Sequence, residues 1–131
     1  MSYYFAATMR SDSIDKASVR VKAALKEEGF GVLTEIDVQA TLSEKIGVDF
    51  RPYRILGACN PKLALSALQA EDKIGTMLPC NVIIQETGEG QFEVAAVDPV
   101  ASMQAIKNDA LGETAAKVSA KLRAMIGALQ L

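Results

Sequence analysis

The chain has 131 residues, of which 50% are hydrophobic and 23% are charged, so a disordered protein is excluded and one folded domain over residues 1–131 is expected. The sequence contains no histidine, which excludes a Ser-His-Asp triad, a Cys-His dyad and histidine metal ligands. Because no complete catalytic set remains, we expect a protein without enzymatic activity, bound metal or cofactor.

The charge pattern also bears on partners and compartment. The net charge is −2 and the basic residues are scattered, so we expect no nucleic-acid binding. No apolar run approaches the roughly 18 residues that span a bilayer, and residues 1–10 lack the pattern of a secretory signal. We therefore expect a cytoplasmic protein that does not bind membranes and whose two cysteines are reduced.

The first elements are a strand and an amphipathic helix. Residues 2–9 are apolar and aromatic, which is typical of a strand. Apolar residues recur at helical spacing over residues 14–28, after three candidate N-caps at residues 11–13, and Gly29 stands where a left-handed residue closes a helix.

Residues 30–38 alternate in the manner of a half-buried strand. Their pattern predicts that Ile36 shares the buried face with Phe30 and Val32. It predicts that Glu35 and Asp37 form a solvated face on the other side.

The middle of the chain continues this alternation of helices and strands. Residues 39–46 read as a short helix closed by Gly47, and residues 53–59 as the third strand. Asn60 and Pro61 begin the next helix, which runs to about Ala70, because asparagine is a good N-cap and proline is favoured at the first helical position.

The last third of the chain predicts a hairpin and a long helix. Residues 80–86 and 91–97 form two strands around a glycine-containing turn, and a short helical stretch follows Asp98-Pro99. Residues 113–129 form a second long amphipathic helix. This order predicts an α+β two-layer sandwich, with two long helices on a sheet of about five strands.

Two segments carry the most distinctive residues, Cys59-Asn60-Pro61 and Pro79-Cys80-Asn81. Each places a cysteine followed by an asparagine at a strand end, and the two cysteines are 21 positions apart. If the third and fourth strands are antiparallel, these ends lie at the same edge of the sheet. If the strands are parallel, the ends lie at opposite edges.

These segments allow structural and functional interpretations. The cysteines are either buried small hydrophobes or a dithiol for redox or soft-metal chemistry, although two thiols cannot complete a zinc site. Asn60 is either only a helix N-cap, or it faces a ligand together with Asn81.

Several stretches of this sequence resemble the family called domain of unknown function 302. The resemblance covers roughly residues 3–105 and is carried by Glu28-Gly29-Phe30-Gly31-Val32-Leu33-Thr34-Glu35-Ile36-Asp37, Ala40-Thr41-Leu42, Lys45-Ile46-Gly47, Tyr53-x-Ile55-Leu56-Gly57-Ala58-Cys59-Asn60-Pro61 and Leu78-Pro79-Cys80-Asn81-Val82.

The resemblance implies a fold similar to the TATA-binding protein, with a β-α-β4-α core and a curved antiparallel sheet. It also implies a small prokaryotic protein that is often a homodimer and has no assigned activity. An antiparallel sheet favours the arrangement in which Cys59 and Cys80 are neighbours.

We therefore expect a non-catalytic module that binds a small molecule or a partner. Its ligand-binding residues would be Cys59, Asn60, Pro61, Pro79, Cys80 and Asn81. The alternative hypothesis is a thiol-based redox or soft-metal-handling protein that uses Cys59 and Cys80.

Overall fold

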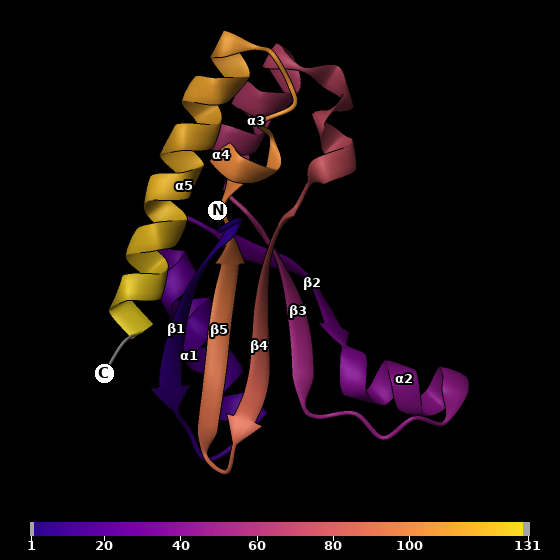
Figure 1. The fold of residues 1–131 in the computed structure, drawn as a ribbon. Helices are drawn as coiled ribbons and strands as arrows, with labels where there is room; N and C mark the ends of the chain where they lie inside the picture. Colours follow the sequence, from indigo (N-terminus) through magenta and orange to yellow (C-terminus); the bar gives the residue numbers. More distant parts are fainter. Residues whose placement is uncertain (1, 130–131) are drawn as a thin grey trace.

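Five strands with alternating side chains form one antiparallel sheet in the computed structural model, which describes residues 2–129 (Figure 1). The strands are β1 (Tyr4–Arg10), β2 (Gly31–Asp37), β3 (Tyr53–Cys59), β4 (Cys80–Gly88) and β5 (Gln91–Val97). Their order across the sheet is β1-β5-β4-β3-β2, and every neighbouring pair is antiparallel.

The helices lie on one face of this sheet or at its ends. They are α1 (Ile14–Glu27), α2 (Val38–Ile46), α3 (Pro61–Ala70), the 3-10 helix η1 (Asp72–Met77), α4 (Pro99–Ser102) and α5 (Asp109–Leu129). The two long helices, α1 and α5, pack on the sheet and on each other, and the opposite face of the sheet is left uncovered (Figure 1). The predicted α+β two-layer sandwich is confirmed.

The main core lies between these two layers. Leu25 of α1 and Met125 of α5 are fully buried, as are the inward-facing Val82, Ile84 and Val94 of the central strands. Burying an apolar side chain of this size contributes about 1.5–3 kcal/mol relative to its exposure to water. The helical and strand periodicities of the sequence therefore predict which faces form this core.

The helix ends follow the predicted capping chemistry. The Oγ atom of Ser13 accepts a hydrogen bond from the backbone N–H of Lys16 and caps α1. Gly29 and Gly47 have φ angles of +84° and +66°, which side chains disfavour and glycine tolerates.

The predicted alternation of β2 is wrong beyond Val32, because a β-bulge interrupts the strand. Val32 pairs with Ala58 and Thr34 pairs with Gly57, so Leu33 is the extra residue. An extra residue exchanges the two faces for every later position. Ile36 consequently lies 47% exposed, apart from the buried Phe30.

Glu35 is the carboxylate that the bulge turns toward the helices. Its carboxylate oxygens lie 2.7 Å from Lys22 Nζ of α1 and 3.3 Å from Arg54 Nη1 of β3. The predicted face of Glu35 is therefore wrong, but Glu35 and Asp37 are both exposed, as predicted, and Glu35 takes part in a surface ion-pair network with α1 and β3.

The sequence also misplaces the elements beside the last helix. Helix α5 begins at Asp109 rather than near residue 113. The reason is Asn108, whose Oδ1 atom accepts a hydrogen bond from the backbone N–H of Leu111 and starts the helix earlier. The 3-10 helix at Asp72–Met77 was not predicted, because short helices of this kind have no periodic apolar pattern.

Candidate functional site

The two cysteine-containing segments meet where β3 ends and β4 begins. In the β3–β4 pair, Ala58 lies opposite Cys80 and Gly57 lies opposite Asn81. Cys59 is therefore one position beyond the residue that faces Cys80. Of the two predicted alternatives, the structure has the antiparallel one, which brings the two segments to the same edge.

A second hydrophobic cluster lies above this edge, and we call α3, η1 and residues 103–115 the cap. Its buried residues are Ala67, Ile74, Met103, Leu111 and Ala115. Asn108 joins its parts, because its Nδ2 atom donates a hydrogen bond of 2.8 Å to the carbonyl of Ala70 at the end of α3. The cap is thus an apolar cluster separate from the main core.

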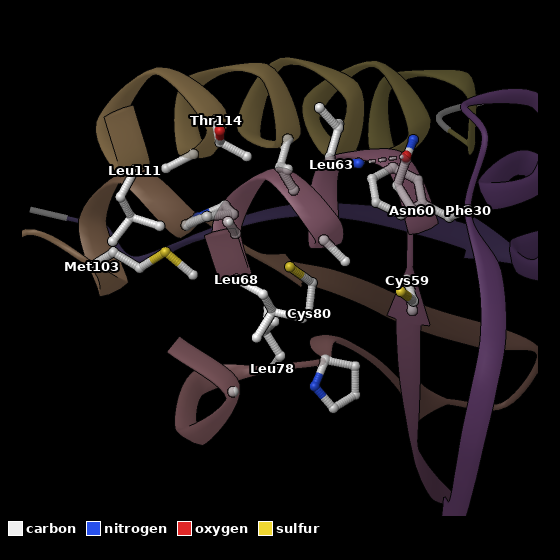
Figure 2. A pocket seen from close by; sticks show the side chains of 18 of the residues that line it. Phe30, Cys59, Asn60, Leu63, Leu68, Leu78, Cys80, Met103, Leu111 and Thr114 are labelled. Atoms are coloured by element: carbon white, nitrogen blue, oxygen red, sulfur yellow. Dashed lines mark hydrogen bonds between the residues drawn. The ribbon is translucent and has the colours of Figure 1, made fainter. Parts of the chain in front are cut away.

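A cavity of about 340 Å³ lies between the cap and the sheet (Figure 2). Its walls come from segments that are far apart in the sequence. They are Phe30, Leu33, Ala58, Cys59, Asn60, Leu63, Ala64, Ala67, Leu68, Gly75, Leu78, Pro79, Cys80, Pro99, Met103, Leu111, Thr114, Ala115 and Val118.

The walls of this cavity are almost entirely apolar. Among the described residues, no charged side chain lines it. The polar groups are Asn60, Thr114 and the two thiols, and the Thr114 hydroxyl already donates a hydrogen bond to the carbonyl of Ala110. Small-molecule sites are typically apolar cavities of about 300–1,000 Å³ with few polar groups.

Leu33 and Leu68 mark the mouth of the cavity. Both line it, yet they are 68% and 42% exposed, respectively. Leu33 is the bulge residue of β2. The bulge that exchanges the two faces of the strand for the later residues also places the Leu33 side chain at the mouth of the cavity. Bulges of this kind are common beside functional sites, where they redirect a side chain.

Only some of the six predicted ligand-binding residues line the cavity. Cys59, Asn60, Pro79 and Cys80 line the cavity. Pro61 is exposed at the first position of α3.

The two asparagines do not face the same space. Asn60 caps α3, because its Oδ1 atom accepts a hydrogen bond of 3.2 Å from the backbone N–H of Leu63. Asn81 is exposed and lines two other hollows, one with Tyr53 and Ile83 on the uncovered face of the sheet and one with Pro79 and Cys80.

Both cysteines have free thiols. Burial, together with the nearby Cys59, raises the pKa of the Cys80 thiol from 9.0 to about 11. A thiol with such a pKa is protonated at neutral pH and is a poor nucleophile or metal ligand. Within residues 2–129, no three His, Cys, Asp or Glu side chains are grouped so as to hold a metal ion.

Sequence reasoning missed most of the cavity wall. Phe30, Leu68, Met103 and Leu111 belong to four separate elements or loops and carry no chemical motif. Their apolar character predicts burial but not which elements they meet. One usable signal is the helix at 61–70, whose apolar residues need a partner besides the main sheet.

In the part of the chain that the structure describes, no helix is both long and apolar enough to span a bilayer.

Comparison with known proteins finds a matching family and a similar crystal structure. The family model described as "Domain of unknown function DUF302" matches residues 6–129. The crystal structure of the uncharacterized conserved protein DUF302 from Bacillus stearothermophilus is similar, with a TM-score of 0.89 and 28% sequence identity. The alignment covers 99% of this chain and 100% of that one. No curated protein matches the sequence.

Proposed function

The chain belongs to the DUF302 family, and from the geometry of its site we propose that it is a non-catalytic module that binds a small apolar molecule. The observation that carries this proposal is the cavity of about 340 Å³ between the cap and the sheet. Four of the six residues singled out in the sequence, Cys59, Asn60, Pro79 and Cys80, line it.

The chemistry of the walls supports binding rather than catalysis. Catalysis needs groups that donate or accept protons or that attack the substrate. The cavity offers two thiols, of which burial raises the pKa of Cys80, together with a satisfied Thr114 hydroxyl and the Asn60 amide, and it holds no acid–base pair. Apolar ligands need only the exclusion of water, which contributes about 25 cal/mol per Å² of buried apolar surface.

The alternative hypothesis, thiol-based redox or soft-metal handling by Cys59 and Cys80, has less support. Cys59 is one position beyond the residue that pairs with Cys80, so the two cysteines are not directly opposite each other. Burial raises the pKa of the Cys80 thiol and so disfavours its thiolate. Modification of the native protein with iodoacetamide at pH 7.5 separates the two hypotheses. Rapid modification of Cys80 would favour thiol chemistry, whereas protection until unfolding favours a structural thiol.

The binding proposal is tested by filling the cavity. Ala64 lines the cavity on α3 and is half-buried, so Ala64→Phe should abolish the binding of medium-chain aliphatic ligands. Ala23 lies exposed on α1, and Ala23→Phe is the matched control that should leave binding unchanged. Ligand-observed NMR measures both. Equal binding by wild type and Ala64→Phe would contradict the proposal.

We further propose that the protein is a homodimer through β2 and α2. β2 is an edge strand, and no residue of α2 is buried (Figure 1). Exposed apolar side chains are found in this region at Ile36, Ile46 and Val48. Exposed apolar side chains of this kind are typical of interfaces.

Sedimentation velocity tests the dimer. The variant Ile36→Lys with Ile46→Lys should shift the protein to monomer, whereas Val19→Lys with Leu65→Lys, which changes exposed apolar residues elsewhere, should not. A monomeric wild-type protein would refute the dimer without affecting the proposal about the cavity.

A further inference from the structure

We infer that the binding site continues past Met103 into a second hollow, and that its ligand is a neutral, unbranched aliphatic chain whose length Met103 limits. The inference rests on the proposed small-molecule function. It adds to that function a second compartment and a residue that selects among ligands by their length.

The second hollow is the one that Asn81 lines together with Pro79 and Cys80, and its volume is about 280 Å³. It adjoins the cavity, because four residues line both spaces: Pro79, Cys80, Pro99 and Met103. A residue that lines two spaces lies between them. These four residues therefore form a partition between the cavity and the second hollow.

Met103 is the part of this partition that can move. The side chains of Pro79 and Pro99 are closed rings, and Cys80 has a short side chain on the central strand β4. Methionine is unbranched and has three rotatable bonds. Met103 lies in the connection between α4 and α5, and it is the only buried residue of positions 103–108. Its side chain, which points into the cavity in Figure 2, can turn aside without disturbing a strand.

The shape of the ligand follows from this partition. When the Met103 side chain turns aside, the space that it vacates has the cross-section of an unbranched chain. A branched or cyclic group is wider than that space, because the two proline rings and the strand beside it stay in place. The part of the ligand that passes the partition is therefore a linear aliphatic chain.

The charge of the ligand follows from the walls. In the part of the chain that the structure describes, no charged side chain lines the cavity or the second hollow. A charged group that entered either space would lose hydration without gaining a counter-charge. Both compartments therefore favour a neutral molecule.

The volumes predict which chain lengths need the second hollow. An apolar cavity of about 150 Å³ accommodates one benzene molecule. The cavity of about 340 Å³ accommodates roughly twice as many atoms, which is about the size of 2-undecanone. The ketone 2-pentadecanone is four methylenes longer, so it fits only if its chain passes Met103 and enters the second hollow.

Equilibrium dialysis of the whole protein against each ketone measures the two dissociation constants. Each buried methylene strengthens binding about 4-fold, because its transfer from water is worth about 0.8 kcal/mol. In Met103→Ala the long chain no longer has to displace a side chain. This variant should raise the preference for 2-pentadecanone over 2-undecanone by about 10-fold or more relative to wild type.

Ser102→Leu distinguishes entry into the second hollow from simple enlargement of the cavity. Ser102 lines the second hollow and not the cavity, so a leucine there occupies the space that the long chain needs. Added to Met103→Ala, it should reverse the gain for 2-pentadecanone and change the binding of 2-undecanone by less than about 2-fold, below the effect of one methylene.

Leu111→Ala is the matched control for Met103→Ala. Leu111 is also buried and lines the cavity, but it does not line the second hollow. Its removal enlarges the cavity without opening the partition. Any change in chain-length preference that Leu111→Ala causes should therefore be the same with and without Ser102→Leu.

Intermolecular NOEs test the inference in the wild-type protein, whether or not the variants fold. Leu63 lines only the cavity and Thr76 only the second hollow. We expect 2-pentadecanone to give NOEs to the methyl groups of both residues, and 2-undecanone to give NOEs to Leu63 but not to Thr76.

The outcomes separate this inference from the proposed function. If both ketones contact Leu63 and neither contacts Thr76, the inference is overturned while the apolar site stands. The same holds if Met103→Ala leaves the chain-length preference unchanged, or if its gain survives Ser102→Leu. Failure of both ketones to bind the wild-type protein would overturn the proposed function and the inference together.

Discussion

The Oγ1 atom of Thr34 occupies the space in which a side chain at Gly57 would lie, and the Cγ atom of Pro79 is only 2.7 Å from a Cβ atom added there. Thr34 pairs with Gly57 directly after the bulge at Leu33. Thr34 of β2 and Pro79, directly before β4, therefore approach Gly57 of β3 so closely that only glycine fits at position 57.

Gly57→Ala should consequently destabilise the protein by about 1–3 kcal/mol, because the added methyl overpacks this contact. Adding Thr34→Ala should recover part of that loss, since the Pro79 ring still obstructs the methyl group. Urea unfolding of the two single variants and the double variant measures the coupling, which we expect to exceed about 0.5 kcal/mol.

Gly127 provides the matched control for this substitution. It lies in α5, and a Cβ atom there would meet no atom within 4 Å. Gly127→Ala should stabilise the protein by up to about 1 kcal/mol, since alanine favours helices. If Gly57→Ala leaves the free energy of unfolding unchanged, the strands do not need this close approach.

The second prediction concerns the contribution of Arg54 to stability, because this residue contacts three side chains beside α1. Its guanidinium contacts the carboxylates of Asp15 and Glu35 and the hydroxyl of Ser18, and its side chain is only 17% exposed. If the guanidinium is removed, the two carboxylates and the hydroxyl lose their partner in a partly buried position. Arg54→Met should therefore lower the free energy of unfolding by about 1–3 kcal/mol.

The pair between Lys16 and Asp12 is the control, because its side chains are 69% and 87% exposed. Lys16→Met should change the stability by less than about 0.5 kcal/mol. Equal effects of the two substitutions in chemical unfolding would mean that the network around Arg54 contributes nothing beyond surface charge.

The Cys80 thiol predicts a pH dependence of stability. Its pKa rises from 9.0 in the unfolded chain to about 11 in the fold, chiefly through burial. Between these values the unfolded chain releases a proton that the folded protein keeps, so the thiol stabilises the fold fully below pH 9 and this stabilisation is lost as the pH rises toward 11. The full loss is roughly 3 kcal/mol.

Cys80→Ala should remove this part of the alkaline loss, because alanine does not titrate. The difference in free energy of unfolding between wild type and variant, measured from pH 8 to 11, isolates the thiol from lysine and tyrosine titration. A difference that stays constant with pH would contradict the burial of an ionisable Cys80.

Asn108 supports a prediction about the cap. Its Nδ2 atom donates to Ala70 at the end of α3, and its Oδ1 atom caps α5. Asn108→Asp keeps the cap of α5 but loses the bond to Ala70, so α3 should open more often. Hydrogen exchange of α3 amides should become about 5- to 10-fold faster, which corresponds to one lost hydrogen bond, whereas exchange in β4 should not change.

Much of this fold could be predicted from residue patterns, and the exceptions have physical causes. Helices α1 and α3 carry local signals at Ser13, Asn60 and Pro61, which fix their starts. The bulge at Leu33 has no local signal, because an alternating sequence gives no indication that one residue is extra. Glu35 was therefore misplaced.

The candidate site shows the same division between local and long-range information. The sequence identified Cys59, Asn60, Pro79 and Cys80, because strand ends and caps are local features. It did not identify Leu68, Met103 or Leu111, whose roles depend on how the cap packs on the sheet. An apolar wall also has no motif that distinguishes it from ordinary core.

The most direct test of a ligand-binding cavity is the position of a bound ligand. Intermolecular NOEs between 2-undecanone and uniformly ¹³C-labelled wild-type protein locate the ligand on the molecule. We predict NOEs to Leu111 and to Phe30, because both residues line the cavity and lie at opposite ends of it. NOEs only to Tyr53 and Ile83 of the uncovered sheet face, or none at all, would contradict the account.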